Sequence, residues 1–255
     1  MQDKYVGDVG DFGKFQLFRY LFNHEESPMY GKALAQIWYM HEGEGENNND
    51  GKHIDYFERM TGCDEYLENS LLSIIMRDKR EVRELESLKL LPNAKFFYQK
   101  VPKALNERHH WFNSALTFSH NVQVVAVEPD NGMALKCNRG EQCFEFLTLE
   151  KDYAQKPYPH KYIFAEEVDN FYRLPHLEVC IVYQHLGRCF AHNVQIETLL
   201  SDLRKSYLYV IAVKHKPYSP RAFFFLCRSE EIKERIEMRL DRFSTEFSAF
   251  WEVFR

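Results

Sequence analysis

Apolar residues recur along this chain at two different periods, and each change of period marks a new element. Between Phe12 and Phe22 they recur at spacings of three and four, which predicts one apolar face of a helix that ends near Asn23. Helical patterns continue at 64–89, where Pro92 stops the pattern, and at 105–119, 161–174, 194–204 and 229–243.

Short apolar runs between these helices predict strands at 35–40, 95–100, 122–127, 177–184, 207–214 and 222–227. The run VQVVAV at 122–127 is nearly all β-branched, so it predicts a strand buried on both faces and is the best candidate for a central strand. Strands that alternate with helices imply parallel βαβ units. Only HKPYSPR separates the last two strands, which is too short for a helical crossover, so these two should pair antiparallel.

The pattern therefore predicts a single α/β domain over residues 1–255, with a mostly parallel sheet closed by a C-terminal antiparallel hairpin. Rossmann-like methyltransferases end in this way, and so do other α/β sheets, so the fold alone does not give the function. Residues 133–160 are irregular in pattern and predict an insertion or a lid. In such a fold the active crevice lies at the carboxyl ends of the strands.

Composition narrows the classes of partner. With 33 Lys and Arg against 38 Asp and Glu, the net charge is -5, so a nucleic-acid partner would need a local patch. The turn of the predicted hairpin offers one in Lys214, Lys216 and Arg221. No apolar run approaches the ~20 residues of a membrane span. Met1 leads straight into a polar run, and the six cysteines lie far apart, which predicts a reducing, cytoplasmic location.

The opening GDVGDFGKF places Asp8, Asp11 and Lys14 among three glycines at the start of the first helix. Backbone amides at a helix N-terminus attract anions, and a lysine there reaches a carboxylate or a phosphate. The alternative is that Asp11 simply caps the helix and the glycines are incidental.

Two polar segments follow predicted strands. HEGEGENNNDG contains Gly43 and Gly45, a pattern typical of a loop that passes under a nucleotide-like ligand. With His41 and its acidic neighbours, this loop is suited to bind a cofactor's hydroxyls and amine or a divalent ion, unless it is only a solvated connection.

The second segment, VEPDNGM, brings Glu128, Asp130 and Asn131 to the end of the predicted central strand. A carboxylate pair there suits metal binding or proton transfer, whereas the bland alternative is an Asn-Gly turn. YQHLGR adds His185 after the next strand, where a lone histidine is often structural.

The order of these motifs resembles bacterial 23S rRNA adenine-N6 methyltransferases and, more loosely, three-Cys-motif partner proteins. GDVGDFGKF is similar to the family's GNxADxLKH element, MHEGEG to its THAGxG loop, and YQKVP to its YPGSP element, while EPDNG stands in the place of the catalytic DPPYE. The matches are Gly7, Asp11, Lys14, His41, Gly43 and Gly45. The chain also resembles an uncharacterised bacterial family with the pattern DVGDFxKYxLLR followed by DPDNG.

The resemblance implies an S-adenosylmethionine-dependent methyltransferase fold with Lys14, His41 and Glu128 near the cofactor. In amino methyltransferases the DPPY element holds the target amino group with its acid and a backbone carbonyl, and its aromatic residue stacks on the base. Here Asp130 and Asn131 occupy the third and fourth positions, so the stacking residue is lost.

Three functions follow as hypotheses. The first is a methyltransferase-like enzyme acting on nucleic acid or a nucleotide. It would bind S-adenosylmethionine and use as cofactor-binding residues Asp11, Lys14, His41, Gly43 and Gly45, and as catalytic residues Glu128, Asp130 and Asn131. The second is a nuclease or phosphodiesterase dependent on Mg or Mn. Its ligands would be Asp8, Asp11, Glu128 and Asp130. The third is a catalytically silent binding protein.

Overall fold

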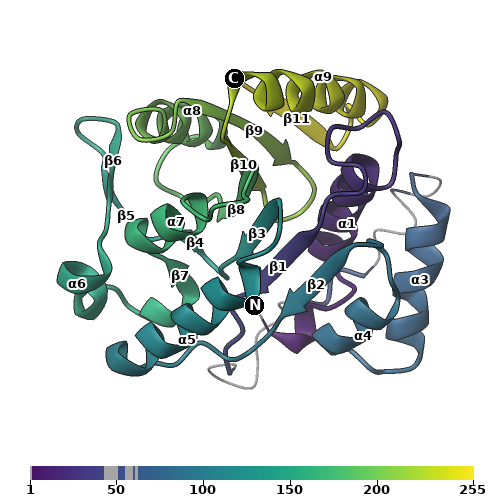
Figure 1. Ribbon diagram of the computed structural model, residues 1–255, viewed down its shortest axis with the longest axis horizontal. Coiled ribbons are helices and arrows are strands. Elements are labelled where there is room, and N and C mark those ends of the chain that lie inside the picture. The colour runs from purple at the N-terminus through teal and green to yellow at the C-terminus, as the bar shows by residue number, and fades with distance from the viewer. Residues whose placement is uncertain (1, 43–50, 55–59, 61–62) are drawn as a thin grey trace.

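A computed structural model describes residues 2–42, 51–54, 60 and 63–255. Its centre is a seven-stranded sheet with the order β11-β9-β10-β8-β3-β1-β2 (Figure 1). The strands are β1 (Leu34–Trp38), β2 (Ala94–Phe97), β3 (Val124–Glu128), β8 (Val179–His185), β9 (Tyr209–His215), β10 (Arg221–Cys227) and β11 (Trp251–Phe254). β2, β1, β3 and β8 run parallel to one another, so the fold is a mixed α/β structure with a largely parallel central sheet.

The predicted antiparallel pairing at the C-terminal end is confirmed. β10 pairs antiparallel with β9 and also with β8, so it lies between two strands that share a direction. The short strand β11 was not predicted, because it has only four residues, which carry no alternating pattern of their own. It pairs antiparallel with β9 and covers that edge of the sheet.

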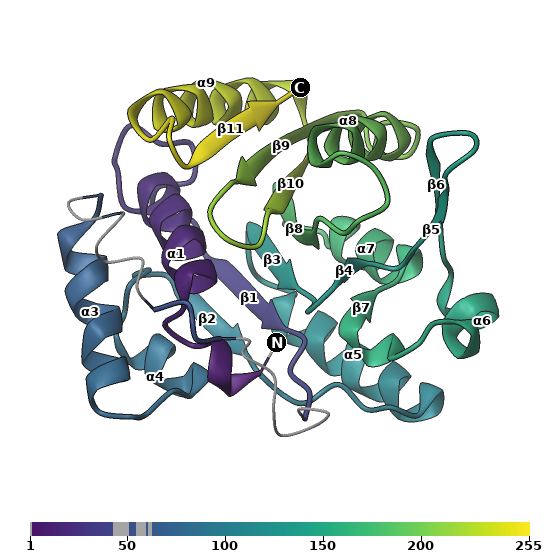
Figure 2. The same ribbon diagram turned by 180° about the vertical axis from the view of Figure 1, so that it is seen from behind.

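Helices cover both faces of the sheet (Figure 2). They are α1 (Val9–Phe22), α3 (Glu65–Met76), α4 (Val82–Ser87), α5 (Leu105–Ser119), α6 (Leu149–Asp152), α7 (Ala165–Tyr172), α8 (His192–Leu203) and α9 (Glu230–Glu246). The single helix predicted at 64–89 is wrong. Asp78 adopts a φ of 53°, which no right-handed helix allows, and so α3 and α4 are separate.

The prediction of an irregular segment at 133–160 is also wrong in part. This segment contains β5 (Leu135–Asn138) and β6 (Cys143–Phe146), which form an antiparallel hairpin, followed by α6. β4 (Gly132–Met133) pairs with β7 (Tyr162–Ile163), so the segment returns to the body of the fold where it left. The helix predicted from residue 161 begins after β7, as α7.

Two hydrophobic clusters fill the space between the sheet and its helices. One includes Phe15 of α1, Leu71 of α3 and Leu240 of α9, and the other includes Phe112 of α5 and Leu199 of α8. Alternate residues of β3 belong to the two clusters, and its four valine and alanine residues are at most 2% exposed. β3 is therefore an interior strand buried on both faces, as its composition predicts.

No helix in the described ranges is both long enough and apolar enough to cross a membrane.

Cys137 of β5 forms a disulfide with Cys189, in the loop after β8, with Cα atoms 6.5 Å apart. The sequence, which predicts a reducing location, gave no sign of this bond, because its two cysteines are 52 residues apart.

Candidate functional site

A cavity of about 400 Å³ opens at the carboxyl ends of β3 and β8. Its walls come from the first turn of α1, the segment after β3, the end of β8 and the start of β10. Its lining includes Asp8, Gly10, Asp11, Glu128, Asp130, Asn131, Lys161, Tyr183, His185, Ser219 and Arg221. Motifs far apart in the sequence thus meet at one site, because the carboxyl ends of parallel strands share one edge of the sheet.

The first turn of α1 is organised by two carboxylates. Asp8 is the N-cap, and its Oδ1 accepts hydrogen bonds from the amides of Gly10 and Asp11 at 2.7 and 3.1 Å. Asp11 Oδ2 accepts from the amide of Gly7 at 2.9 Å. The alternative in which Asp11 caps the helix is therefore wrong. Burial and the neighbouring Asp11 carboxylate raise the pKa of Asp8, although Arg221 acts in the opposite direction.

Gly10 has a steric reason to be glycine. A Cβ atom at this position would lie 1.9 Å from Nη1 of Arg221. The absence of a side chain therefore lets the guanidinium group of Arg221 rest against the first turn of α1, at the wall of the cavity.

Lys14 lies behind the cavity wall. Its Nζ donates to Asp11 Oδ1 at 2.7 Å and to Glu128 Oε2 at 2.8 Å, and it sits 3.7 Å from the centroid of the Trp38 ring. The side chain is 2% exposed, so its ammonium does not face the cavity as the resemblance implies. Gln36 also donates to Glu128 Oε2, at 3.2 Å. Burial and the nearby Asp11 carboxylate raise the pKa of Glu128 against the effect of Lys14.

His41 contacts the carboxylate of Asp130, as Lys14 contacts that of Glu128. Its Nε2 lies 3.0 Å from Asp130 Oδ2 and its Nδ1 lies 3.0 Å from the carbonyl oxygen of Glu42. Lys161 Nζ is 3.6 Å from the same carboxylate oxygen. Burial alone raises the pKa of Asp130, but the surrounding positive charge and the bond to His41 outweigh it and hold the pKa well below its ordinary value. Gly43 and Gly45 lie outside the described residues.

Asp130 and Asn131 belong to a turn that also lines the cavity, so the turn predicted for EPDNG is confirmed, while its role in metal binding or proton transfer stays a prediction. The amide of Gly132 donates to the carbonyl of Pro129 at 3.4 Å. Gln184, buried at the end of β8, accepts from the amide of Met133 at 2.8 Å. Gly132 has a φ of 88°, and a Cβ there would lie 2.5 Å from Gln184 Oε1, so the turn is fixed against β8.

Arg108 of α5 is a positioning residue that the sequence did not reveal. It is fully buried, pairs with Glu167 at 2.7 Å, and donates to the carbonyls of Pro159 and Tyr162 at 3.2 and 2.6 Å. These bonds fix the position of the segment that contains Lys161, whose side chain lines the cavity. Arg108 lies in the polar run NERHH, which is typical of a solvated helix face, so only the three-dimensional contacts identify it.

The basic residues predicted as a patch lie around the β9–β10 turn and have different partners. Lys214 donates to Asn193 Oδ1 at 2.6 Å, and Lys216 donates to the carbonyl of Ser248 at 2.7 Å. Arg221 lines the cavity.

The metal hypothesis receives no support from the geometry. Among the residues that the structure describes, no group of three or more His, Cys, Asp or Glu side chains is arranged to hold a metal ion. The carboxylates of Asp8, Asp11, Glu128 and Asp130 instead accept bonds from separate amides and cations.

Comparisons with known proteins assign no reaction to the chain. No family model and no curated protein matches it. Protein LPL1258 from Legionella pneumophila str. Philadelphia 1, of family model DUF519, is similar in structure, with a TM-score of 0.45, 11% identity, and 98% of this chain and 97% of that chain covered. Human methyltransferase-like protein 13, in complex with SAH, has a TM-score of 0.35 and 11% identity, with 91% and 92% covered.

Proposed function

We propose that this chain is an S-adenosylmethionine-dependent, methyltransferase-like enzyme that acts on nucleic acid or a nucleotide. The observation that carries the proposal is the acidic cavity at the carboxyl ends of β3 and β8, where Asp8, Glu128 and Asp130 share the lining with Arg221. The position of β10 between β8 and β9 supports it, since Rossmann-like methyltransferase sheets end in this manner.

The residues present fit this cofactor. A volume of about 400 Å³ lies within the usual range for small-molecule sites. S-adenosylmethionine carries a sulfonium, an ammonium and a carboxylate group. The acidic side chains suit the two cationic groups, and Arg221 at the first turn of α1 suits the carboxylate. When bound, the cofactor supplies an electrophilic methyl group.

The chain's own residues would orient the acceptor and manage its proton. Asp130, kept ionised by its cationic neighbours, accepts a hydrogen bond from an amino group of the substrate. The Asn131 amide can both donate to and accept from the same substrate. Glu128, whose pKa is raised, is suited to receive a proton released by that amino group. Lys14 and His41 act through the carboxylates that they hold.

Isothermal titration calorimetry with S-adenosylmethionine, and separately with magnesium and manganese, tests the proposal. We expect the cofactor to bind. We also expect Arg221→Gln to weaken its binding roughly tenfold or more, the usual effect of losing a hydrogen bond to a charged group. Metal binding without cofactor binding would support the nuclease hypothesis. Binding of neither would leave the silent binding protein.

A further inference from the structure

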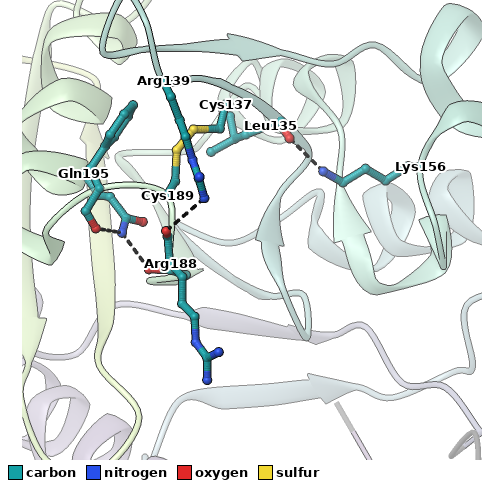
Figure 3. Close-up of a disulfide and its surroundings, with 9 residues drawn as sticks. Leu135, Cys137, Arg139, Lys156, Arg188, Cys189 and Gln195 are labelled. Atoms are coloured by element: carbon teal, nitrogen blue, oxygen red, sulfur yellow. Dashed lines mark hydrogen bonds between the residues drawn. A yellow bond between two sulfur atoms is a disulfide. The ribbon is translucent and has the colours of Figure 1, made fainter.

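The β5–β6 hairpin projects at one edge of the molecule and is tied back by a covalent bond (Figures 1 and 2). Cys137 of β5 is joined to Cys189 in the loop between β8 and α8 (Figure 3). The rings of Phe144 and Phe190 pack edge to face beside this bond, with centroids 5.4 Å apart. The disulfide thus fixes the hairpin against the loop that follows β8.

A second cavity, of about 770 Å³, opens beside the disulfide. Its charged lining residues are Lys136, Arg139, Glu145 and Arg188. Lys136 and Glu145 pair across the hairpin at 3.4 Å, so these two charges compensate each other. Within the described part of the chain, neither Arg139 nor Arg188 has a carboxylate at ion-pair distance, and both guanidinium groups face this hollow uncompensated.

The tether places Arg139 against the backbone of Arg188. Arg139 Nη2 lies 3.5 Å from the carbonyl oxygen of Arg188, and Figure 3 shows the Arg188 side chain extending away from this contact. The two guanidinium groups therefore offer separate positive charges along one hollow, in a chain whose net charge is -5.

The location connects this hollow to the candidate active site. The Asp130–Asn131 turn continues through β4 into β5, and His185 at the end of β8 leads into the loop that carries Arg188. Short stretches of chain therefore join two walls of the acidic cavity to the basic hollow. A polymer has further units beyond the one in the acidic cavity that can contact the hollow, whereas a free nucleotide has none.

We propose that Arg139 and Arg188, on the two segments that the Cys137–Cys189 disulfide joins, bind backbone phosphates of a polynucleotide substrate. Guanidinium groups are planar forks that match phosphate oxygens with two parallel hydrogen bonds, which suits this role better than a lysine would. The inference rests on the proposed function and narrows its substrate from nucleic acid or a nucleotide to a polymer.

The test measures the affinity of the oxidised protein for a fluorescein-labelled, mixed-sequence single-stranded RNA over a series of salt concentrations. We expect Arg188→Ala to raise Kd roughly tenfold and to reduce the slope of log K against log salt by about 0.7, the value for one phosphate contact on a single strand. Arg139→Ala should act in the same direction. Arg235→Ala, an exposed arginine of α9 that pairs with Glu231, is the matched control and should change neither quantity.

Breaking the disulfide provides a second, independent test. Reduction with dithiothreitol, or the substitution Cys137→Ser, should weaken RNA binding. In the Arg139→Ala protein, breaking the disulfide should weaken RNA binding no further, because the disulfide acts by positioning the Arg139 side chain. An unchanged salt slope in Arg188→Ala would overturn the inference. So would changes of Kd and salt slope in Arg235→Ala that equal those in Arg188→Ala. Calorimetry with S-adenosylmethionine separates the two proposals: a wild type that binds the cofactor but no RNA refutes only the phosphate site, and one that binds no cofactor refutes the function.

Discussion

Lys14 should contribute more to stability than a charged residue usually does, because it compensates two buried carboxylates at once. Its side chain and that of Asp11 are each 2% exposed, and that of Glu128 is 14% exposed. Removing one partner of a buried ion pair typically costs about 3–5 kcal/mol, since the other charge stays buried without compensation. For a chain of this size, Lys14→Met should therefore lower Tm by roughly 6–20 °C.

The pH dependence of this effect has a definite sign. Lys14 lowers the pKa of Glu128, so its loss raises the folded-state pKa of that carboxyl group further. A carboxyl group with a raised folded-state pKa stabilises the fold below its unfolded pKa, and this contribution is lost as pH rises through the folded value. The deficit of Lys14→Met should thus be largest near neutral pH and should shrink toward pH values of about 5.

Thermal melting of the wild type and the variant at several pH values measures both effects. Methionine keeps an apolar stem beside Trp38, so the variant removes mainly the charge. Lys32→Met is the control, because Lys32 pairs with Glu178 at a site where both side chains are more than a quarter exposed. It should change the free energy of unfolding by at most about 1 kcal/mol. A Lys14→Met protein that melts with the wild type at every pH would refute the reasoning.

Three further substitutions, one of them with a matched control, test other parts of the site. Gly132→Ala should destabilise the fold by about 1–3 kcal/mol, because its φ is positive and Gln184 occupies the space of the new methyl group. Gly187→Ala, with nothing within 4 Å, should change stability by less than about 0.5 kcal/mol in the same melting assay. Asp130→Asn should reduce methyl transfer by about 10²–10⁴-fold with little change in Tm, and a large loss of Tm would show that it holds the fold instead. Arg108→Ala should cost about 3–5 kcal/mol in chemical denaturation, because its carboxylate partner remains buried, and a near-neutral result would contradict the positioning role.

Periodicity was enough to predict most of the central sheet. The β-branched run around Val125 is an interior strand, and the short connection before Arg221 forms the antiparallel hairpin. Both features depend on local composition and on connection length, which a sequence records directly. The break at Asp78 and the strand β11 depend on single backbone angles and on tertiary pairing, and neither leaves a periodic signal.

The sequence predicted part of the lining of the cavity, but not how its side chains contact one another. The sequence places Asp8, Asp11, Glu128 and Asp130 at one edge of the sheet, and the structure brings them to one cavity. Which groups face a ligand was not predictable, because a lysine close to glycines at a helix start suggests an exposed anion site. The contacts of Lys14 with two carboxylates come from residues up to 114 positions apart and exist only in the folded chain.

The positions of Lys14 and His41 decide what the acidic cavity offers to a ligand. Both side chains are held behind Glu128 and Asp130, where they contact these carboxylates and are not among the residues that line the cavity. In the cavity lining, Asp8, Asp11, Glu128 and Asp130 outnumber Lys161 and Arg221, so a cationic sulfonium or ammonium group gains from it more than a phosphate does. If the substrate is a polynucleotide, its phosphates must therefore be held outside the acidic cavity. The hollow lined by Arg139 and Arg188 meets that requirement, since the same two chain segments lead to it and its acidic lining residue, Glu145, is paired with Lys136.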